Sequence, residues 1–285
     1  EYGVCDKITP LVRRVIANNP GPFTYTGTGT YIIGSNELAV IDPGPVDNDH
    51  LEAILSITKN QKITHIIVTH THNDHSPLSK YLQEKTGALI YSFNENDINT
   101  GDENKFEEGY DKEFKCDVGV KDGDIIKGKD WTLQAIHTPG HTSNHLCYSL
   151  EEEKILFSGD HVMGWSTTVI VPPDGNMEEY MQSLEKLLQR NDKYYLPTHG
   201  KMIKNPQDLV KKYISHRITR ENQIEEAIKS GNNKVIDIVK IIYADVDKKL
   251  YPAASMSTLA HLKRMIDNGQ IKVSGSNLDG FYEIN

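Results

Sequence analysis

Cysteine and long apolar runs are scarce in this sequence of 285 residues. The three cysteines, Cys5, Cys116 and Cys147, are far apart and lack metal-ligand spacing. An odd number of scattered cysteines argues against a disulfide framework and favours a reducing compartment. No apolar run approaches the ~20 residues that cross a bilayer. We therefore expect no membrane association, and a cytoplasmic or other reducing location, the mitochondrial matrix if a presequence preceded Glu1.

Positive charge is scarce in most of the chain. Residues 1–200 contain 17 Lys and Arg against 30 Asp and Glu, whereas residues 201–285 contain 14 against 10. The acidic part argues against broad binding to nucleic acid duplexes. The basic part leaves room for a local contact with an anionic polymer, although a solvated helix surface has the same composition.

The segment 69–76 is the densest chemical motif. Its candidate ligands are three histidines and one aspartate: His70, His72, Asp74 and His75. The apolar run 63–68 before it predicts a buried strand, and residues 78–86 after it predict a helix. Imidazole and carboxylate groups are ligands that zinc prefers. His70 and His72 point the same way from an extended chain, and Asp74 and His75 then turn elsewhere. This spacing predicts two adjacent metal ions.

Four motifs elsewhere in the chain also have an aspartate or a histidine at the end of an apolar run or in a short turn. They are Asp42 before Pro43-Gly44, His141 in His-Thr-Pro-Gly-His-Thr, Asp160 after Phe157-Ser158-Gly159, and His199 before Gly200. Together with the His-x-His-x-Asp-His motif, their order resembles the metallo-β-lactamase superfamily. Matches at 19–22, 29–31 and 213–217 extend the resemblance to the branch named for β-lactamase-like protein 2.

The resemblance implies a ligand set for two zinc ions, with Mn²⁺ and Fe²⁺ as alternatives. Metal 1 takes His70, His72 and His141, whereas metal 2 takes Asp74, His75 and His199, and Asp160 bridges both. The two metals share a hydroxide that acts as the nucleophile. Asp74 is the expected catalytic residue, because it reaches the hydroxide and can shuttle its proton.

For each residue around these ligands, the pattern leaves two roles open. Asp42 is expected to orient the ligand loop and a ligand histidine without binding metal, and turn capping is its alternative role. Four residues after the later ligands are candidates for substrate contact, with packing as the alternative: Asn144, His145, Thr167 and Thr168.

The fold class is α/β, and the resemblance implies a four-layer αβ/βα sandwich in residues 1–200. Strands alternate with helices there, and residues 94–118 are expected to form a surface excursion near the mouth of the site. Residues 201–285 change to helix patterns at 206–230, 234–244 and 255–268, followed by a two-stranded ribbon. We predict a C-terminal winged-helix-like domain with its boundary near Gly200.

The metals predict hydrolysis but leave the bond open. Asp160 stands where broad-spectrum β-lactamases have Cys, and His72 stands where diiron oxygen reductases have Glu. The 38 residues between Asp160 and His199 leave no room for the inserted domain of larger RNA-processing relatives. The first hypothesis is an endoribonuclease acting on single-stranded RNA. The alternative is a small-molecule thioester or lactone hydrolase of the glyoxalase II type, and a binding module with structural metals is the third hypothesis.

Overall fold

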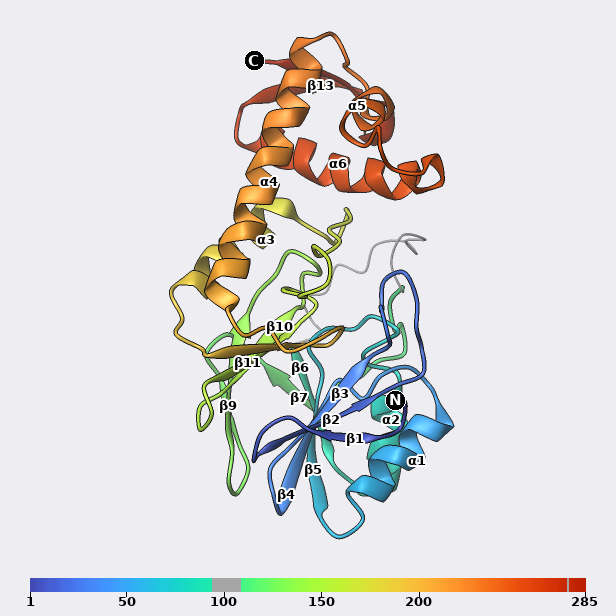
Figure 1. Cartoon of the computed structure of the whole chain (residues 1–285), viewed down its shortest axis with the longest axis vertical. Helices are drawn as coiled ribbons and strands as arrows, with labels where there is room; N and C mark the ends of the chain where they lie inside the picture. The colour runs from blue at the N-terminus through green and yellow to red at the C-terminus, as the bar shows by residue number, and fades with distance from the viewer. Residues whose placement is uncertain (94–108, 276) are drawn as a thin grey trace.

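The computed structural model describes residues 1–93, 109–275 and 277–285. Two β-sheets pack face to face, and helices cover the outer face of each (Figure 1). Within the described residues, the first sheet has the strand order β1-β2-β3-β4-β5-β6-β7 and the second has the order β12-β11-β10-β9-β8. The strands are β1 Cys5–Lys7, β2 Val12–Ile16, β3 Gly29–Ile33, β4 Glu37–Ile41, β5 Lys62–Ile67, β6 Leu89–Phe93, β7 Val118–Val120, β8 Ile125–Lys127, β9 Thr132–His137, β10 Leu146–Leu150, β11 Ile155–Gly159 and β12 Tyr194–Pro197. The predicted four-layer αβ/βα sandwich is confirmed.

Alternation along the strands divides the core into layers. On β3, Tyr31 and Ile33 pack between the two sheets, while Ile32 belongs to the cluster under the outer helices. On β4, Ile41 and Val40 divide in the same way, because successive side chains of a strand point to opposite faces. The helices α1 Asn48–Ile57 and α2 Leu78–Thr86 cover the first sheet, and α3 Met177–Leu188 covers the second.

Parallel strand pairs bring the chemical loops to one edge of the sandwich. β4 is parallel to β5 in the first sheet, and β11 is parallel to β12 in the second. The loops that follow these four strands carry Asp42, the segment 69–76, Asp160 and His199. Because parallel strands end at the same edge, distant parts of the chain meet there.

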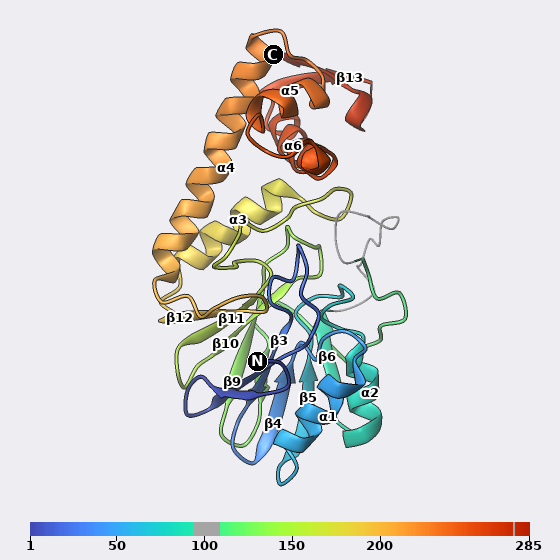
Figure 2. The ribbon, with the colours of Figure 1, turned by 45° about the vertical axis from the view of Figure 1, so that its right-hand side comes forward.

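The C-terminal part has the helices and two-stranded ribbon predicted for a winged-helix-like domain, and the long helix α4 Pro206–Lys229 joins it to the sandwich (Figure 2). It contains α5 Val235–Ile242, α6 Tyr251–Asp267, β13 Ile271–Ser274 and β14 Phe281–Ile284, with its own apolar core. α6 begins four residues before the predicted start at 255, because Pro252 lies in the first turn, where a missing N–H is tolerated.

The sequence pattern does not predict three of the short strands. β1, β7 and β8 have three residues each, too few to establish an alternating pattern. Val118 therefore begins a strand, whereas residues 94–118 were expected to be irregular, and residues 94–108 lie outside the described residues. In the described part of the chain, no helix combines the length and the apolar character needed to cross a membrane.

Candidate metal centre

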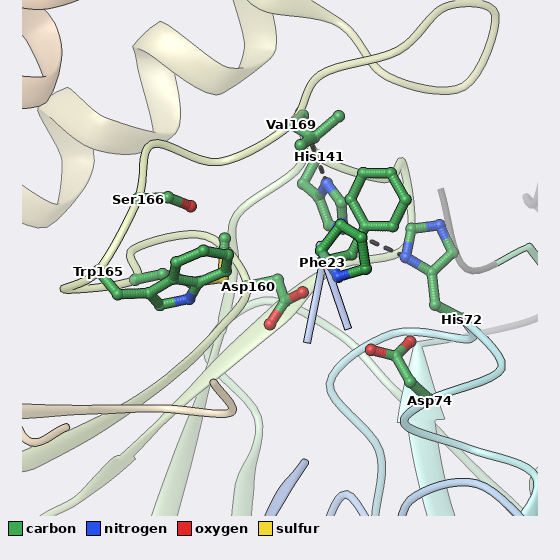
Figure 3. A pocket seen from close by; sticks show the side chains of 10 residues that line it. Phe23, His72, Asp74, His141, Asp160, Trp165, Ser166 and Val169 are labelled. Carbon is green, nitrogen blue, oxygen red and sulfur yellow. Dashed lines mark hydrogen bonds between the residues drawn. The ribbon is translucent and has the colours of Figure 1, made fainter. Parts of the chain in front are cut away.

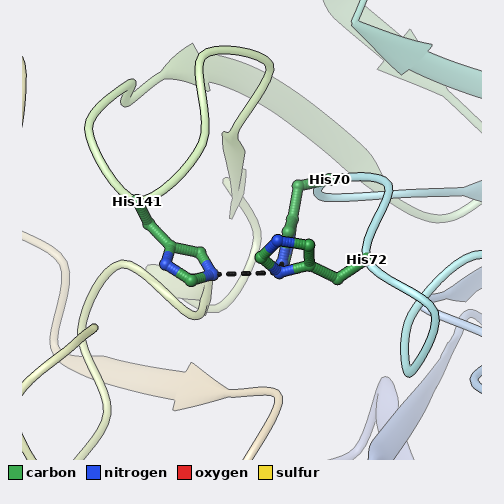
Figure 4. Close-up of side chains that lie close together, drawn as sticks. All are labelled: His70, His72 and His141. Atoms are coloured by element: carbon green, nitrogen blue, oxygen red, sulfur yellow. Dashed lines mark hydrogen bonds between the residues drawn. The ribbon is translucent and has the colours of Figure 1, made fainter. Parts of the chain in front are cut away.

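The first group of candidate ligands consists of His70, His72 and His141. The ligand atoms of these buried residues lie within 4.8 Å of one another. His72 Nδ1 is 3.0 Å from His70 Nε2 and 3.2 Å from His141 Nε2. His141 Nδ1 lies 2.7 Å from the carbonyl oxygen of Val169, so this nitrogen carries the proton and Nε2 keeps its lone pair. Three ring nitrogens from two loops thus converge on one point (Figure 4).

The second group consists of Asp74, His75, Asp160 and His199, which are also buried and within 4.8 Å of one another by their ligand atoms. Asp74 Oδ2 lies 3.0 Å from His199 Nε2 and 3.4 Å from His75 Nε2. Asp160 Oδ2 lies 3.5 Å from each of the same two nitrogens. The structure therefore brings together all seven predicted ligands in the two predicted groups, with Asp160 in the second. Metal binding by these residues stays a prediction.

The two groups differ in charge. Burial lowers the pKa of His70 well below its ordinary value, and the neighbouring histidines lower it further. Burial also lowers the pKa of His75, but the carboxylates of Asp74, Asp160 and Asp42 outweigh burial and raise this pKa well above its ordinary value. In the first group, the imidazole of His70 is thus held in its neutral form. The second group holds a proton where a metal ion would supply the positive charge.

The donor atoms fit a pair of cations. Asp74 Oδ1 and Asp160 Oδ1 are buried and have no hydrogen-bond partner among the described residues. A buried carboxylate oxygen without a partner is costly, and coordination of a cation removes that cost. Nitrogen and carboxylate oxygen donors in a buried site suit zinc and related divalent metals.

Asp42 braces the second group from behind. Its Oδ1 accepts a hydrogen bond of 2.8 Å from the backbone N–H of Thr69, and its Oδ2 accepts bonds of 2.8 Å from the hydroxyls of Thr69 and Thr198. Asp42 Oδ2 also lies 3.0 Å from His75 Nδ1, which leaves Nε2 directed at the metal position. The carboxylate contacts the ligand loop and a ligand histidine. These contacts are the ones that the predicted orienting role of Asp42 requires.

A cavity opens onto both groups. Its floor is formed by His72, Asp74, His141 and Asp160, and its total empty space is about 400 Å³ including the part open to solvent (Figure 3). The walls are mainly apolar and come from two loops: Pro22, Phe23, Met163, Trp165, Ser166 and Val169. The ring of Trp165 stacks on Tyr25 with 5.0 Å between ring centroids. Trp165 thus lines the cavity and also packs against Tyr25.

The four predicted substrate contacts do not line this cavity. Asn144 donates a 2.8 Å bond to the Thr71 hydroxyl, and His145 Nε2 accepts a 3.2 Å bond from the N–H of Asp160. The Thr168 hydroxyl donates to the carbonyl oxygen of Asp160 at 2.7 Å. These three residues are buried, so we correct the expectation of substrate contact: they support the ligand loops. Thr167 is half-buried and is also not among the lining residues.

Sequence reasoning missed the wall residues, because Phe23, Met163 and Val169 belong to no ligand motif. Tyr110 was also missed: its ring lies 4.8 Å from that of His72, and its hydroxyl donates a 2.8 Å bond to Asp174. Beside Phe23, the one sequence feature that could have drawn attention to this segment was the Pro-Gly-Pro turn before it.

The fold and the paired His/Asp groups define a class of metal-dependent hydrolases. The chain belongs to the metallo-beta-lactamase superfamily, whose family pattern matches residues 26–199. The beta-lactamase associated winged helix domain matches residues 235–280. Both predictions of family and enzyme class are confirmed.

Two curated relatives and one solved structure show how far the similarity extends. The chain is 30% identical over 276 residues to a Beta-lactamase-like protein 2 homolog of Caenorhabditis elegans, covering 94% of this chain and 88% of the relative. It is 31% identical over 232 residues to an atrochrysone carboxyl ACP thioesterase of Aspergillus chevalieri, covering 80% and 69%. A beta-lactamase domain protein from Burkholderia ambifaria has the same fold, with a TM-score of 0.82, 18% identity and coverage of 99% and 94%.

Proposed function

We propose that this hydrolase binds two zinc ions and cleaves a small-molecule thioester or lactone that carries an apolar or aromatic acyl group. The observation that carries the proposal is the cavity itself. Its floor holds residues of both ligand groups, and its walls include two aromatic rings, Phe23 and Trp165. Ligand sites of this kind combine apolar walls with a few polar groups at the reacting end.

The charge of the cavity argues against a phosphodiester substrate. None of the ten residues that line the cavity in the described structure is Lys or Arg. Contacts from Lys and Arg to phosphates supply most of the affinity for nucleic acids. The acidic balance of residues 1–200 acts in the same direction. An apolar acyl group, in contrast, needs no Lys or Arg in the cavity walls.

The protein residues have separate tasks in this reaction. When bound, zinc supplies positive charge that activates water and polarises the substrate oxygen. His141 keeps its lone pair on Nε2 because Nδ1 is held by the carbonyl oxygen of Val169. Asp74 lines the cavity beside the metal position, so its carboxylate can accept the proton that water loses. The apolar walls exclude competing water and hold the acyl group.

The named activity of the fungal relatives supports the same substrate class. The atrochrysone carboxyl ACP thioesterases cleave a thioester by name, and we extend only that bond type to this chain. We propose no particular acyl group from their names.

Single-stranded RNA is the second candidate substrate. The winged-helix domain and the excess of positive charge in residues 201–285 favour it. This hypothesis was first from the sequence alone. We rank it second because no Lys or Arg lines the described cavity.

One set of assays separates the hypotheses. The zinc-loaded protein is given an aromatic acyl thioester of N-acetylcysteamine, an aryl lactone and a labelled single-stranded RNA oligonucleotide, and its metal content is measured. We expect metal-dependent cleavage of the thioester or the lactone and intact RNA. Cleavage of RNA with both acyl probes unchanged would overturn the proposal. If two metals are bound and no probe reacts, the binding-module hypothesis gains support.

A further inference from the structure

The loop from Asp160 to Val169 joins the metal centre to the cavity wall. Asp160 is a candidate ligand at its start, and Met163, Trp165, Ser166 and Val169 line the cavity (Figure 3). In this described segment, no amide between residues 162 and 170 donates to a backbone carbonyl. Hydrogen bonds from side chains therefore take the place of backbone hydrogen bonds in holding this loop.

Three of those side chains come from helices α3 and α4. The hydroxyl of Tyr213 lies against the carbonyl oxygens of Met163 and Ser166 and donates its single proton to one of them at a time. Arg217 donates from Nη2 to the carbonyl oxygen of Thr168. Tyr213 and Arg217 are one turn apart on α4, so they face the same side, and both are buried.

The same loop is bonded to both ligand groups. The Thr168 hydroxyl donates to the carbonyl oxygen of Asp160 at 2.7 Å, and the carbonyl oxygen of Val169 accepts from His141 at 2.7 Å. On α3, Tyr180 donates to the carbonyl oxygen of His161 at 2.9 Å, and its ring lies 5.2 Å from the Arg217 guanidinium carbon. A displacement of α4 would therefore shift both the ligand residues of the metal centre and the cavity wall.

We propose that Tyr213 and Arg217 are positioning residues of the active site. They hold the 163–168 loop so that Trp165 and Ser166 form one wall of the substrate cavity. Both residues lie beyond residues 26–199, which match the superfamily pattern, so helix α4 completes a cavity that this segment does not shape alone. The kinetic part of this inference rests on the proposed hydrolysis of thioesters or lactones.

The test uses two conservative variants in the full chain, Tyr213→Phe and Arg217→Lys. Each has a matched control whose contacts lie away from the cavity, Tyr243→Phe after α5 and Arg220→Lys on α4. Arg220 packs over the Tyr243 ring at 4.3 Å and contacts the carbonyl oxygen of Ile242. Two readouts are measured on zinc-loaded protein. The first is acrylamide quenching of tryptophan fluorescence. The second is the separate effect on KM and kcat for the thioester or lactone.

Quenching reports on the wall directly. The chain has two tryptophans, and Trp131 is buried in the core between the sheets, so the accessible signal comes from Trp165. We expect Tyr213→Phe and Arg217→Lys to increase quenching relative to their controls. We also expect KM to rise about fivefold to tenfold, the effect of losing one buried hydrogen bond, with two metals still bound. A purely structural role would lower the melting temperature and leave KM unchanged.

The result that overturns the inference is equal quenching and equal KM in each variant and its control. The two proposals fail separately. If the wild-type protein cleaves no acyl probe, the proposed substrate is wrong, and the quenching comparison still tests the role of Tyr213 and Arg217.

Discussion

Replacing Asp42 by Asn should weaken both the folded protein and its metal centre. The buried carboxylate accepts four contacts: from the N–H and the hydroxyl of Thr69, from the hydroxyl of Thr198 and from His75 Nδ1. An amide has one acceptor oxygen, so its NH₂ group must face at least one of these donors. A lost bond to a buried charged acceptor costs about 1.5–3 kcal/mol. We expect the free energy of unfolding of the metal-free protein to fall by about 2–4 kcal/mol.

The metal centre should respond as well, because His75 loses the charge that fixes its orientation. Loss of such a supporting contact typically reduces metal affinity by about 10–100-fold. Urea unfolding and zinc titration against a competing chelator measure the two effects. Asp47→Asn is the matched control, since Asp47 caps α1 and Asn caps a helix nearly as well. If Asp42→Asn unfolds and binds zinc like the control, Asp42 does not organise the ligand loop.

Three further perturbations test the site and the fold. Asp74→Asn should lower kcat by at least about 100-fold, the effect of removing a general base, and full turnover with both metals retained would contradict its role. Removing the metals with a chelator should abolish hydrolysis and lower the melting temperature, and zinc should restore both; a melting temperature that ignores zinc would argue against a site in the folded protein. Burial lowers the pKa of His50 to about 4, so the unfolded chain takes up the proton first. Its contribution to stability is complete above the ordinary pKa of 6.5 and is lost as the pH falls towards 4. His50→Gln should therefore reduce the pH dependence of the unfolding free energy in this range by about 1.4 kcal/mol per pH unit, and an unchanged slope in urea unfolding would contradict this.

Local sequence patterns predicted the positions of helices and strands well. The run 63–68 and the helix at 78–86 are close to β5 and α2 as observed, because alternation and helical periodicity are properties of neighbouring residues. The His-x-His-x-Asp-His motif likewise indicated metal chemistry, since its residue types and spacing are local.

Contacts between distant segments could not be predicted from such local patterns. Asn144, His145 and Thr168 have the residue types of a substrate site, yet they are buried and form hydrogen bonds to the ligand loops. Nothing in the local pattern distinguishes a buried supporting hydrogen bond from an exposed contact with substrate, because burial depends on which elements pack above the residue.

The candidate ligands and the strands that carry them can be recognised along the chain itself, through residue type, spacing and alternation. The meeting of His141, Asp160 and His199 with segment 69–76, the apolar cavity walls and the bonds from α4 to the 163–168 loop arise only when the two sheets and the C-terminal helix pack together. The physical reason is that a hydrogen bond or an ion pair acts over a few ångströms. Separation along the sequence says little about such distances until parallel strands bring their ends to one edge.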